Sequence, residues 1–347
     1  MNNPSIAIAG AGLIGQAHLA ALLSCPQARL SALVDPAPAA QDQAKRLGLA
    51  WFASLDDLLA HQKPDGIVLA TPNALHLPQA LRCISAGVPI LLEKPIAPTV
   101  REAEQIVQAS EDKGMPVLVG HHRAHSPIMA KAVEVVHSGQ LGRIVAVQGS
   151  ATFYKPDDYF EQGSWRSKIG GGPILLNMIH EVHNLRMLCG EIAAVQAMKS
   201  HAVRGFAVED TVAITLRFES GALGTFMLSD TAASARSWEQ TSQENKAYPS
   251  YADEDCYTVS GTLGTLSIPT MRLKTYASES ERSWWKPLEL SQLDLDRQDP
   301  IQIQMAHFVQ VLSGACAPRV SARDGLQNLR VTQAIAQAAQ SDTTITL

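Results

Sequence analysis

The sequence predicts an α/β protein in which an N-terminal, doubly wound parallel sheet is followed by a second α/β domain with mostly antiparallel strands. Three observations support this fold class. Short apolar runs alternate with helical segments through about the first 120 residues, as in parallel sheets covered by helices. A glycine-rich turn joins the first strand to the first helix. Beyond residue 210 the apolar residues recur with a period of two, which is typical of antiparallel strands with one buried face.

Length and composition fit a globular protein of two domains that binds a small molecule. The chain has 347 residues, of which 46% are hydrophobic, so it has ample material for a buried core. A formal net charge of -5 and the absence of dense Lys/Arg tracts argue against nucleic acid or an anionic membrane as a partner. A small-molecule substrate is therefore expected.

The sequence shows no sign of a secreted, membrane-spanning, disulfide-rich or zinc-binding protein. The first residues lack the basic and apolar regions of a signal peptide, and no apolar run is long enough to span a bilayer. A cytoplasmic location is therefore expected. The five cysteines are scattered and form no C-x-x-C pair, which argues against a disulfide framework or a zinc ribbon.

The first strand, Ser5 to Ala9, leads directly into a phosphate-binding turn and a helix from Gln16 to Leu23. In this G-x-G-x-x-G pattern the first glycine permits the tight turn, the second lets a pyrophosphate approach the backbone, and the third lets helix and strand pack closely. The N–H groups at the start of the helix face the phosphate charge. The sequence therefore predicts a dinucleotide-binding Rossmann domain, with cofactor contacts from Gly10, Gly12, Leu13, Ile14 and Gly15.

The second strand, Leu30 to Val34, ends in Asp35. An acidic side chain at this place accepts hydrogen bonds from the adenosine ribose hydroxyls and repels a 2′-phosphate. No arginine or lysine follows immediately, so NAD is predicted as the cofactor and NADP is less favoured.

The alternation continues to a second polar turn. Ser54 and Asp57 form a predicted capping box for a short helix. A buried strand from Gly66 to Ala70 then ends in a turn that belongs at a cofactor crevice, because ligands bind beyond the carboxyl ends of parallel strands. The predicted cofactor contacts there are Thr71, Pro72, Asn73 and His76, the last of which begins the next helix.

The next strand, Val88 to Leu92, runs straight into Glu93, Lys94 and Pro95. The proline fixes its own backbone angle and restricts the residue before it, so Lys94 is held at the carboxyl end of a buried strand. A helix capped by Thr99 and Glu102 and a strand at 117–119 complete the pattern. The predicted Rossmann domain therefore covers residues 1–122.

Together the glycine-rich turn, Thr71-Pro72-Asn73 with His76, and Glu93-Lys94-Pro95 resemble the Gfo/Idh/MocA oxidoreductases, the family of glucose-fructose oxidoreductase and inositol dehydrogenase. The resemblance implies a C-terminal α/β domain over residues 123–347, which binds substrate. Its large, mostly antiparallel open sheet often makes the dimer contact, so a homodimer or homotetramer is expected. It also implies that Glu93 belongs to the cofactor site and that Lys94 is catalytic and contacts both the nicotinamide and the reacting hydroxyl.

The resemblance extends to three segments beyond the Rossmann domain. The turn after the last Rossmann strand implies a cofactor contact from His122 and a substrate contact from Arg123. A glycine-rich loop implies that Trp165 and Arg166 touch cofactor or substrate. His180, on the predicted helix from Ile174 to Leu188, matches the family histidine, and an imidazole titrates where it can shuttle a proton. No metal is expected, because hydride transfer from an alcohol needs none when a lysine is present.

The chain departs from the family at two aspartates near that histidine. Leu176 stands four residues before His180, and His183 replaces the aspartate of H-x-x-D. Asn177 and Asn184 share a helical face with His180, so they are candidates to orient the imidazole. Glu181 on a neighbouring face is a weaker candidate.

The rest of the second domain is read from its periodicity. A helix at 127–137 and a strand at 144–154 precede the histidine helix, and strands at 211–218 and 223–229 form an antiparallel hairpin. The loop at 232–254 is either functional, subunit-bridging or a mobile surface excursion. Further strands and two closing helices are expected at 257–260, 265–268, 271–276, 302–312 and 324–339.

The predicted activity is transfer of a hydride between NAD and a secondary alcohol or ketone of a sugar, sugar acid or cyclic polyol. Lys94 and His180 are the predicted catalytic pair, and Trp165 and Asn177 are further substrate contacts. A sugar acid suits a pocket made cationic by Arg123, Lys155, Arg166 and Lys168. Two alternatives stay open: a redox-neutral glycosidase that uses bound NAD, and a non-catalytic NAD-binding sensor.

Overall fold

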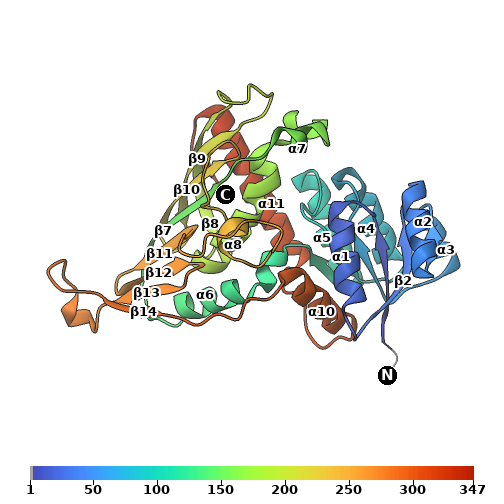
Figure 1. Cartoon of the computed structure of the whole chain (residues 1–347), viewed down its shortest axis with the longest axis horizontal. Helices are drawn as coiled ribbons and strands as arrows, with labels where there is room; N and C mark the ends of the chain where they lie inside the picture. The colour runs from blue at the N-terminus through green and yellow to red at the C-terminus, as the bar shows by residue number, and fades with distance from the viewer. Residues whose placement is uncertain (1–2) are drawn as a thin grey trace. The chain divides into compact units, whose positions relative to one another are not determined.

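The computed structural model describes residues 3–347, and the chain divides into two compact units (Figure 1). The first unit comprises the chain up to His125 together with Asp299–Leu329. The second comprises Ser126–Gln298 and Arg330–Leu347. Across residues 3–347, none of the helices has the length and apolar character needed to cross a membrane.

The first unit is built on a six-stranded parallel sheet in the order β3-β2-β1-β4-β5-β6. The central strands are buried on both faces, as their continuous apolar runs predict. The strand order reverses between β1 and β4, which creates the switch point where doubly wound sheets bind ligands. The strands are β1 (Ser5–Ala9), β2 (Arg29–Val34), β3 (Ala50–Phe52), β4 (Gly66–Leu69), β5 (Ile90–Leu92) and β6 (Val117–Val119).

Local signals place the helices of this unit. Ser54 accepts the Asp57 N–H at 3.1 Å, and Thr99 forms a reciprocal capping box with Glu102, so both predicted N-caps are confirmed. The helices are α1 (Leu13–Leu23), α2 (Pro38–Leu47), α3 (Leu55–His61), α4 (His76–Ser85), α5 (Val100–Lys113) and α10 (Pro300–Leu312).

Segment 299–329 lies in the first unit, whereas we expected it in a second domain beginning at residue 123. The reason is packing. Phe308 and Leu312 of α10 lie so close to Gly66 that a methyl group there would approach their side chains to 3.0 Å or less. The first unit also extends past the expected boundary at 122, to His125.

The second unit is built on a nine-stranded sheet in the order β14-β13-β12-β11-β7-β10-β9-β8-β15. Within this sheet, as described over residues 3–347, only β7 and β10 pair in parallel, and the other paired strands are antiparallel. The strands are β7 (Ile144–Thr152), β8 (Ile192–Ser200), β9 (Thr211–Phe218), β10 (Leu223–Ser229), β11 (Tyr257–Gly261), β12 (Gly264–Ile268), β13 (Arg272–Thr275), β14 (Glu289–Gln292) and β15 (Ile345–Thr346).

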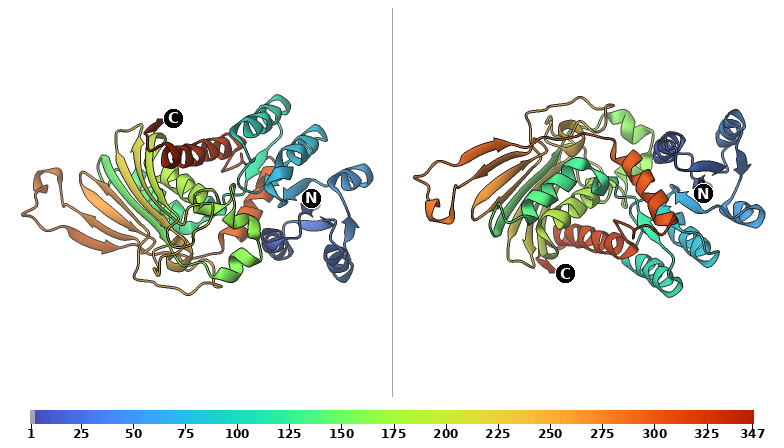
Figure 2. Two further views of the ribbon diagram at one scale, coloured as in Figure 1. Left: turned by 90° about the horizontal axis from the view of Figure 1, so that it is seen from above. Right: turned by 90° about the horizontal axis from the view of Figure 1, so that it is seen from below.

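One face of this sheet is covered by helices (Figure 2), and its side chains form the core of the unit. On β9 and β10, buried and exposed residues alternate, so the opposite face is open. The mostly antiparallel open sheet is therefore confirmed. The helices of this unit are α6 (Pro127–His137), α7 (Asp157–Glu161), α8 (Ile179–Cys189), α9 (Trp238–Thr241) and the second part of α11 (Ala322–Ser341).

Several elements differ from the expected ones. The short strands β3 and β15 were missed because two or three residues show no period. The alanine-rich strand β8 and the polar strand β14 were missed because neither has a clear apolar alternation. The helix expected from Ile174 begins with a π-helical turn, Ile174–Met178, before α8. In the loop at 232–254, Trp238 is buried and its indole donates to Glu244 at 3.0 Å, so part of this loop is anchored.

Candidate functional site

The glycine-rich turn has the shape of a pyrophosphate cradle. Gly10 has a φ of +97°, and a Cβ there would lie 2.4 Å from the Ala70 carbonyl oxygen. A Cβ on Gly15 would lie 2.0 Å from the Gly10 carbonyl oxygen. Gly12, at the N-cap of α1, has open space where its Cβ would stand, and Leu13 beside it is 91% exposed. This helix N-terminus is therefore open to a phosphate group.

Asp35 stands after β2 with both carboxylate oxygens held by the backbone. Its Oδ2 accepts the Ala11 N–H at 2.8 Å, and its Oδ1 accepts the Ala37 N–H at 2.8 Å. The first bond ties the carboxylate to the glycine-rich turn itself. A fixed carboxylate at this place fits the hydroxyls of an adenosine ribose and repels a 2′-phosphate. The residues present therefore fit NAD.

His76 joins the second polar turn to the E-K-P turn. The imidazole is buried, with Nδ1 2.8 Å from the Pro95 carbonyl oxygen and Nε2 3.0 Å from the Thr71 carbonyl oxygen. Burial lowers the pKa of His76 despite these two acceptors. His76 therefore braces these two turns against each other, and its cofactor contact stays a prediction. Pro72 and Asn73 are exposed at this turn and keep their predicted role as cofactor contacts.

Lys94 is half-buried after β5, and Glu93 before it is buried against His18 of α1. His18 Nε2 lies 2.7 Å from Glu93 Oε1, and the Lys94 N–H donates to Glu93 Oε2 at 3.2 Å. Burial alone would raise the pKa of Glu93. The hydrogen bond from His18 and the surrounding positive charges outweigh it, so the pKa is lowered overall. Glu93 thus links α1 to the backbone of the candidate catalytic lysine.

The turn after β6 forms a short 3₁₀ helix from His122 to His125. His122 is half-buried, whereas Arg123 is only 2% exposed. His121 before them lies 3.2 Å from the side-chain nitrogen of Asn328, which returns from the C-terminal part of the first unit. Asn328 was missed because nothing in its local sequence marks it. The cofactor role of His122 and the substrate role of Arg123 stay predictions.

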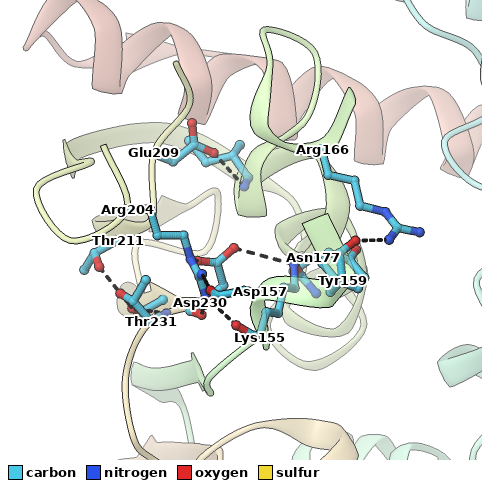
Figure 3. A network of polar contacts seen from close by, with 12 residues as sticks. Lys155, Asp157, Tyr159, Arg166, Asn177, Arg204, Glu209, Thr211, Asp230 and Thr231 are labelled. Carbon is cyan, nitrogen blue, oxygen red and sulfur yellow. Dashed lines mark hydrogen bonds and ion pairs between the residues drawn. The ribbon is translucent and has the colours of Figure 1, made fainter. Parts of the chain in front are cut away.

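In the second unit, Lys155 lies in a buried polar network (Figure 3). Its Nζ donates to Asn177 Oδ1 at 2.8 Å and lies 3.7 Å from Asp230 Oδ2. It also stands 4.9 Å from the centre of the Tyr159 ring. Arg204 donates to Asp230 Oδ1 at 3.0 Å. Burial raises the pKa of Asp230, although the charges of Lys155 and Arg204 act in the opposite direction.

The sequence did not single out Asp230 or Arg204. The available signal was the position of Asp230, directly after the second strand of the predicted hairpin.

His180 is buried on α8, and the side chains expected to orient it have other partners. The side-chain oxygen of Asn177 accepts the hydrogen bond from Lys155. The Asn184 amide donates to the Tyr257 hydroxyl at 3.1 Å, and that hydroxyl donates to the Glu181 carboxylate. Asn177 and Asn184 therefore do not orient the imidazole. The reason is that Lys155, which follows β7, and Tyr257 of β11 approach this segment and bind the two amides.

The glycine-rich loop exposes Trp165 and turns Arg166 back onto Tyr159. Trp165 is 51% exposed, whereas the Arg166 Cζ lies 3.9 Å from the centre of the Tyr159 ring and its Nη1 donates to the Tyr159 carbonyl oxygen at 2.5 Å. The loop ends where Glu209 Oε1 accepts the Ile174 N–H at 2.9 Å. Burial raises the pKa of Glu209. This anchor could not be predicted, because a single carboxylate in a loop forms no sequence pattern.

Two family models together match almost the whole chain. The NAD-binding Rossmann fold of the oxidoreductase family matches residues 5–121, and the C-terminal α/β domain of the same family matches residues 133–347. Both models carry the Gfo/Idh/MocA name, so the resemblance seen in the motifs is confirmed.

Relatives and solved structures agree with these matches. The chain is 26% identical over 297 residues to 1,5-anhydro-D-fructose reductase of Ensifer adhaerens, covering 82% of this chain and 80% of the relative. The WlbA dehydrogenase from Bordetella pertussis, solved with NADH and UDP-GlcNAcA, is 24% identical, with a TM-score of 0.80 over 100% of this chain and 99% of that one. Aldose-aldose oxidoreductase from Caulobacter crescentus, solved with glycerol, is 24% identical, with a TM-score of 0.80 over 100% of both chains.

These two structures show the shared fold, and the family models cover both domains. The cradle at Gly10 and the fixed carboxylate of Asp35 agree with the NAD-binding description of the first domain. This protein belongs to the Gfo/Idh/MocA oxidoreductases and carries the family's NAD-binding Rossmann domain and its C-terminal α/β domain.

Proposed function

We propose that the protein transfers a hydride between NAD and a secondary alcohol or ketone of a sugar or cyclic polyol. The position of Lys94 carries this proposal. In the sheet, β1, β4 and β5 are neighbours and parallel, so their carboxyl ends lie at one edge. The glycine-rich turn, the Thr71 turn and Lys94 follow these three ends. An ammonium group beside the predicted cofactor cradle suits a reaction in which negative charge develops on oxygen.

Each proposed residue has a defined chemical task. When bound, NAD supplies the hydride acceptor. The glycine-rich turn holds the pyrophosphate, and Asp35 accepts hydrogen bonds from the ribose hydroxyls. Lys94 lowers the pKa of the substrate hydroxyl and stabilises the oxyanion that forms. His180 takes the proton in oxidation and returns it in reduction.

The charges of the second unit favour a neutral substrate over a sugar acid. Lys155 and Arg204 both face Asp230, and Arg204 also approaches Asp157 at 3.5 Å. Two positive charges therefore meet two carboxylates, which leaves little excess charge to attract an anionic substrate. Of the other cations expected in the pocket, Arg123 is buried and Lys168 is exposed.

The test is the absorbance of NADH with purified protein, NAD and a panel of inositols, aldoses, sugar acids and glycosides. NADH formation with one substrate group is expected, and Lys94→Ala is expected to abolish it while NAD binding is kept. Lys45→Ala, which removes an exposed lysine of α2, serves as the matched control. Tight NAD binding without NADH formation from any member of the panel would contradict the proposal and favour the glycosidase or the sensor.

We further propose that two copies associate through the open face of the second sheet. Met227 of β10, Ala213 of β9 and Met198 of β8 stand opposite one another in register. Met198 is 72% exposed and Met227 is 43% exposed, and Leu223 of β10 adds a side chain that is 59% exposed. A continuous apolar row across three strands is typical of a surface that is covered by a partner. In a twofold dimer each copy uses the same surface, so the apolar row of one copy would cover that of the other.

A further inference from the structure

The second unit contains a cavity that the proposed reaction does not use. It has a volume of about 490 Å³, within the range of about 300–1,000 Å³ that is usual for small-molecule sites. It lies between the end of β7, helix α7, the 3₁₀ turn at Ser164–Ser167 and the segment 203–206. None of its residues was a site residue in the sequence prediction. The lining consists of Tyr154, Asp157, Phe160, Glu161, Ser164, Ser167, Val203, Arg204 and Phe206.

Arg204 is part of the lining and is already committed to internal partners (Figure 3). Its side chain is only 6% exposed. Besides Asp230 Oδ1 it donates to the Lys155 carbonyl oxygen at 2.7 Å and to the Asp230 carbonyl oxygen at 2.6 Å. It also approaches Asp157 Oδ1 at 3.5 Å. These contacts use four of the five N–H donors of a guanidinium, so Arg204 shapes the cavity and has little capacity left for an anion.

The walls are aromatic. The Phe160 and Phe206 rings lie 5.0 Å apart, and the Arg204 guanidinium lies 4.5 Å from the Phe160 ring and 5.2 Å from the Tyr154 ring. Tyr154 is 58% exposed, so much of its ring is open to a ligand. The faces of aromatic rings carry negative charge, which suits the weakly positive C–H groups on one face of a sugar ring.

The polar groups at the cavity are mainly acceptors. The Asp157 side chain is 85% exposed, and Glu161 is exposed and takes part in no ion pair among residues 3–347. Carboxylates accept strong hydrogen bonds from hydroxyl groups. The lining thus has two carboxylates, from Asp157 and Glu161, and one guanidinium that is already paired, so the cavity disfavours phosphate and carboxylate groups. Aromatic faces beside hydroxyl acceptors, without an available cation, fit a neutral sugar ring.

The cavity is joined to the helix that carries His180. Asp230 contacts both Arg204 and Lys155, and Lys155 binds Asn177, which belongs to the π-helical turn that leads into α8. A ligand held against Arg204 therefore contacts the same ionic network that binds the turn before this helix. Contacts to a remote part of a substrate are the means by which enzymes orient the reacting part.

We propose that this cavity binds the second, non-reacting sugar ring of an uncharged glycoside, an inference that rests on the proposed function for its link to the reaction. The preferred substrate then has two rings. The binding of the second ring itself can be measured without any turnover.

The experiment titrates the full-length protein, loaded with NAD, with cellobiose, maltose and trehalose and with a uronic-acid form of the disaccharide that binds best. Isothermal titration calorimetry gives each Kd. Tyr154→Ala is expected to weaken binding of the neutral disaccharide about threefold to tenfold. Tyr251→Ala, which truncates a tyrosine of the same unit that is 46% exposed, is expected to leave it unchanged.

Glu161→Gln keeps the shape of an exposed side chain and therefore tests the charge without a folding risk. It is expected to weaken the neutral disaccharide about threefold to tenfold and to tighten the uronic-acid form, because one repelling carboxylate is gone. Glu219→Gln is the matched control at another exposed position. Absence of disaccharide binding, or equal effects of each cavity variant and its control, would overturn the subsite.

Turnover separates this inference from the proposed function. If the subsite binds but no sugar is oxidised, the proposed function fails and the subsite stands. If sugars are oxidised and the ratio of kcat/KM for disaccharide over monosaccharide does not fall in Tyr154→Ala, the subsite fails and the proposed function stands.

Discussion

The buried pair of His18 and Glu93 allows a quantitative test of the first unit, and the change is His18→Leu. His18 is 1% exposed and Glu93 is 5% exposed, and their 2.7 Å contact joins α1 to the end of β5. Leucine fills much of the imidazole volume but removes the hydrogen bond. Breaking a buried pair costs about 3–5 kcal/mol. Because the charges of Lys94 and His122 still stabilise the carboxylate, we expect the lower end, about 3 kcal/mol.

The loss has a defined pH dependence. In the wild-type protein the pKa of Glu93 lies below its ordinary value of 4.5. A carboxyl with a lowered pKa contributes stability that is present above the unfolded pKa and is lost as the pH falls through the folded pKa. In His18→Leu the hydrogen bond no longer opposes burial, so the pKa of Glu93 rises. The difference in unfolding free energy is therefore largest near neutral pH and shrinks in acid.

Urea unfolding followed by circular dichroism at about pH 7 and about pH 4 measures this difference. His61→Leu is the control, because it removes an exposed histidine from the same unit. Equal stability of the two variants near neutral pH would refute the reasoning. A difference that grows on acidification would refute it as well.

Two further predictions concern the glycine-rich turn and the open sheet. Gly15→Ala places a methyl group 2.0 Å from a backbone carbonyl oxygen, so it is expected to destabilise the protein by about 1–3 kcal/mol in urea unfolding. The methyl group of Gly12→Ala meets open space, so this variant is expected to change stability by less than about 0.5 kcal/mol. It is expected to weaken NAD binding in a fluorescence titration. Equal stability losses in Gly15→Ala and Gly12→Ala would contradict this. Met198→Asp combined with Met227→Asp is expected to give a smaller particle in analytical ultracentrifugation, whereas Lys113→Asp, at an exposed position of α5 in the first unit, is not. An unchanged particle in the double variant would exclude this interface.

The first unit was predictable because each of its signals lies within a few residues. The Ser5 strand, its glycine-rich turn and the cap at Thr99 are local patterns, and all stand where the sequence predicts them. The packing of α10 in the first unit could not be predicted, because an apolar helical face does not say which sheet it covers. Likewise, the bracing role of His76 depends on the Pro95 carbonyl, which only the folded sheet brings near.

The polar network of the second unit was not predictable from local patterns. It nevertheless follows the rule that residues after the ends of adjacent parallel strands lie close together, as in the first unit. Lys155 and Asp230 are far apart in the sequence, but both follow the ends of β7 and β10, the one parallel pair in the described second sheet. Thr152 pairs with Ser229, and beyond them the Lys155 N–H donates to the Asp230 carbonyl oxygen at 2.9 Å.

The same arrangement brings a carboxylate to the helical segment that contains Leu176. The carboxylate comes from the end of β10 and acts through Lys155 and its bond to Asn177. This carboxylate belongs to Asp230, which follows a strand of the sheet and is not part of the helix. Burial raises the pKa of Asp230. In both units, therefore, adjacent parallel strands deliver charged residues to a common edge, and the charged groups proposed to serve the reaction lie at those edges.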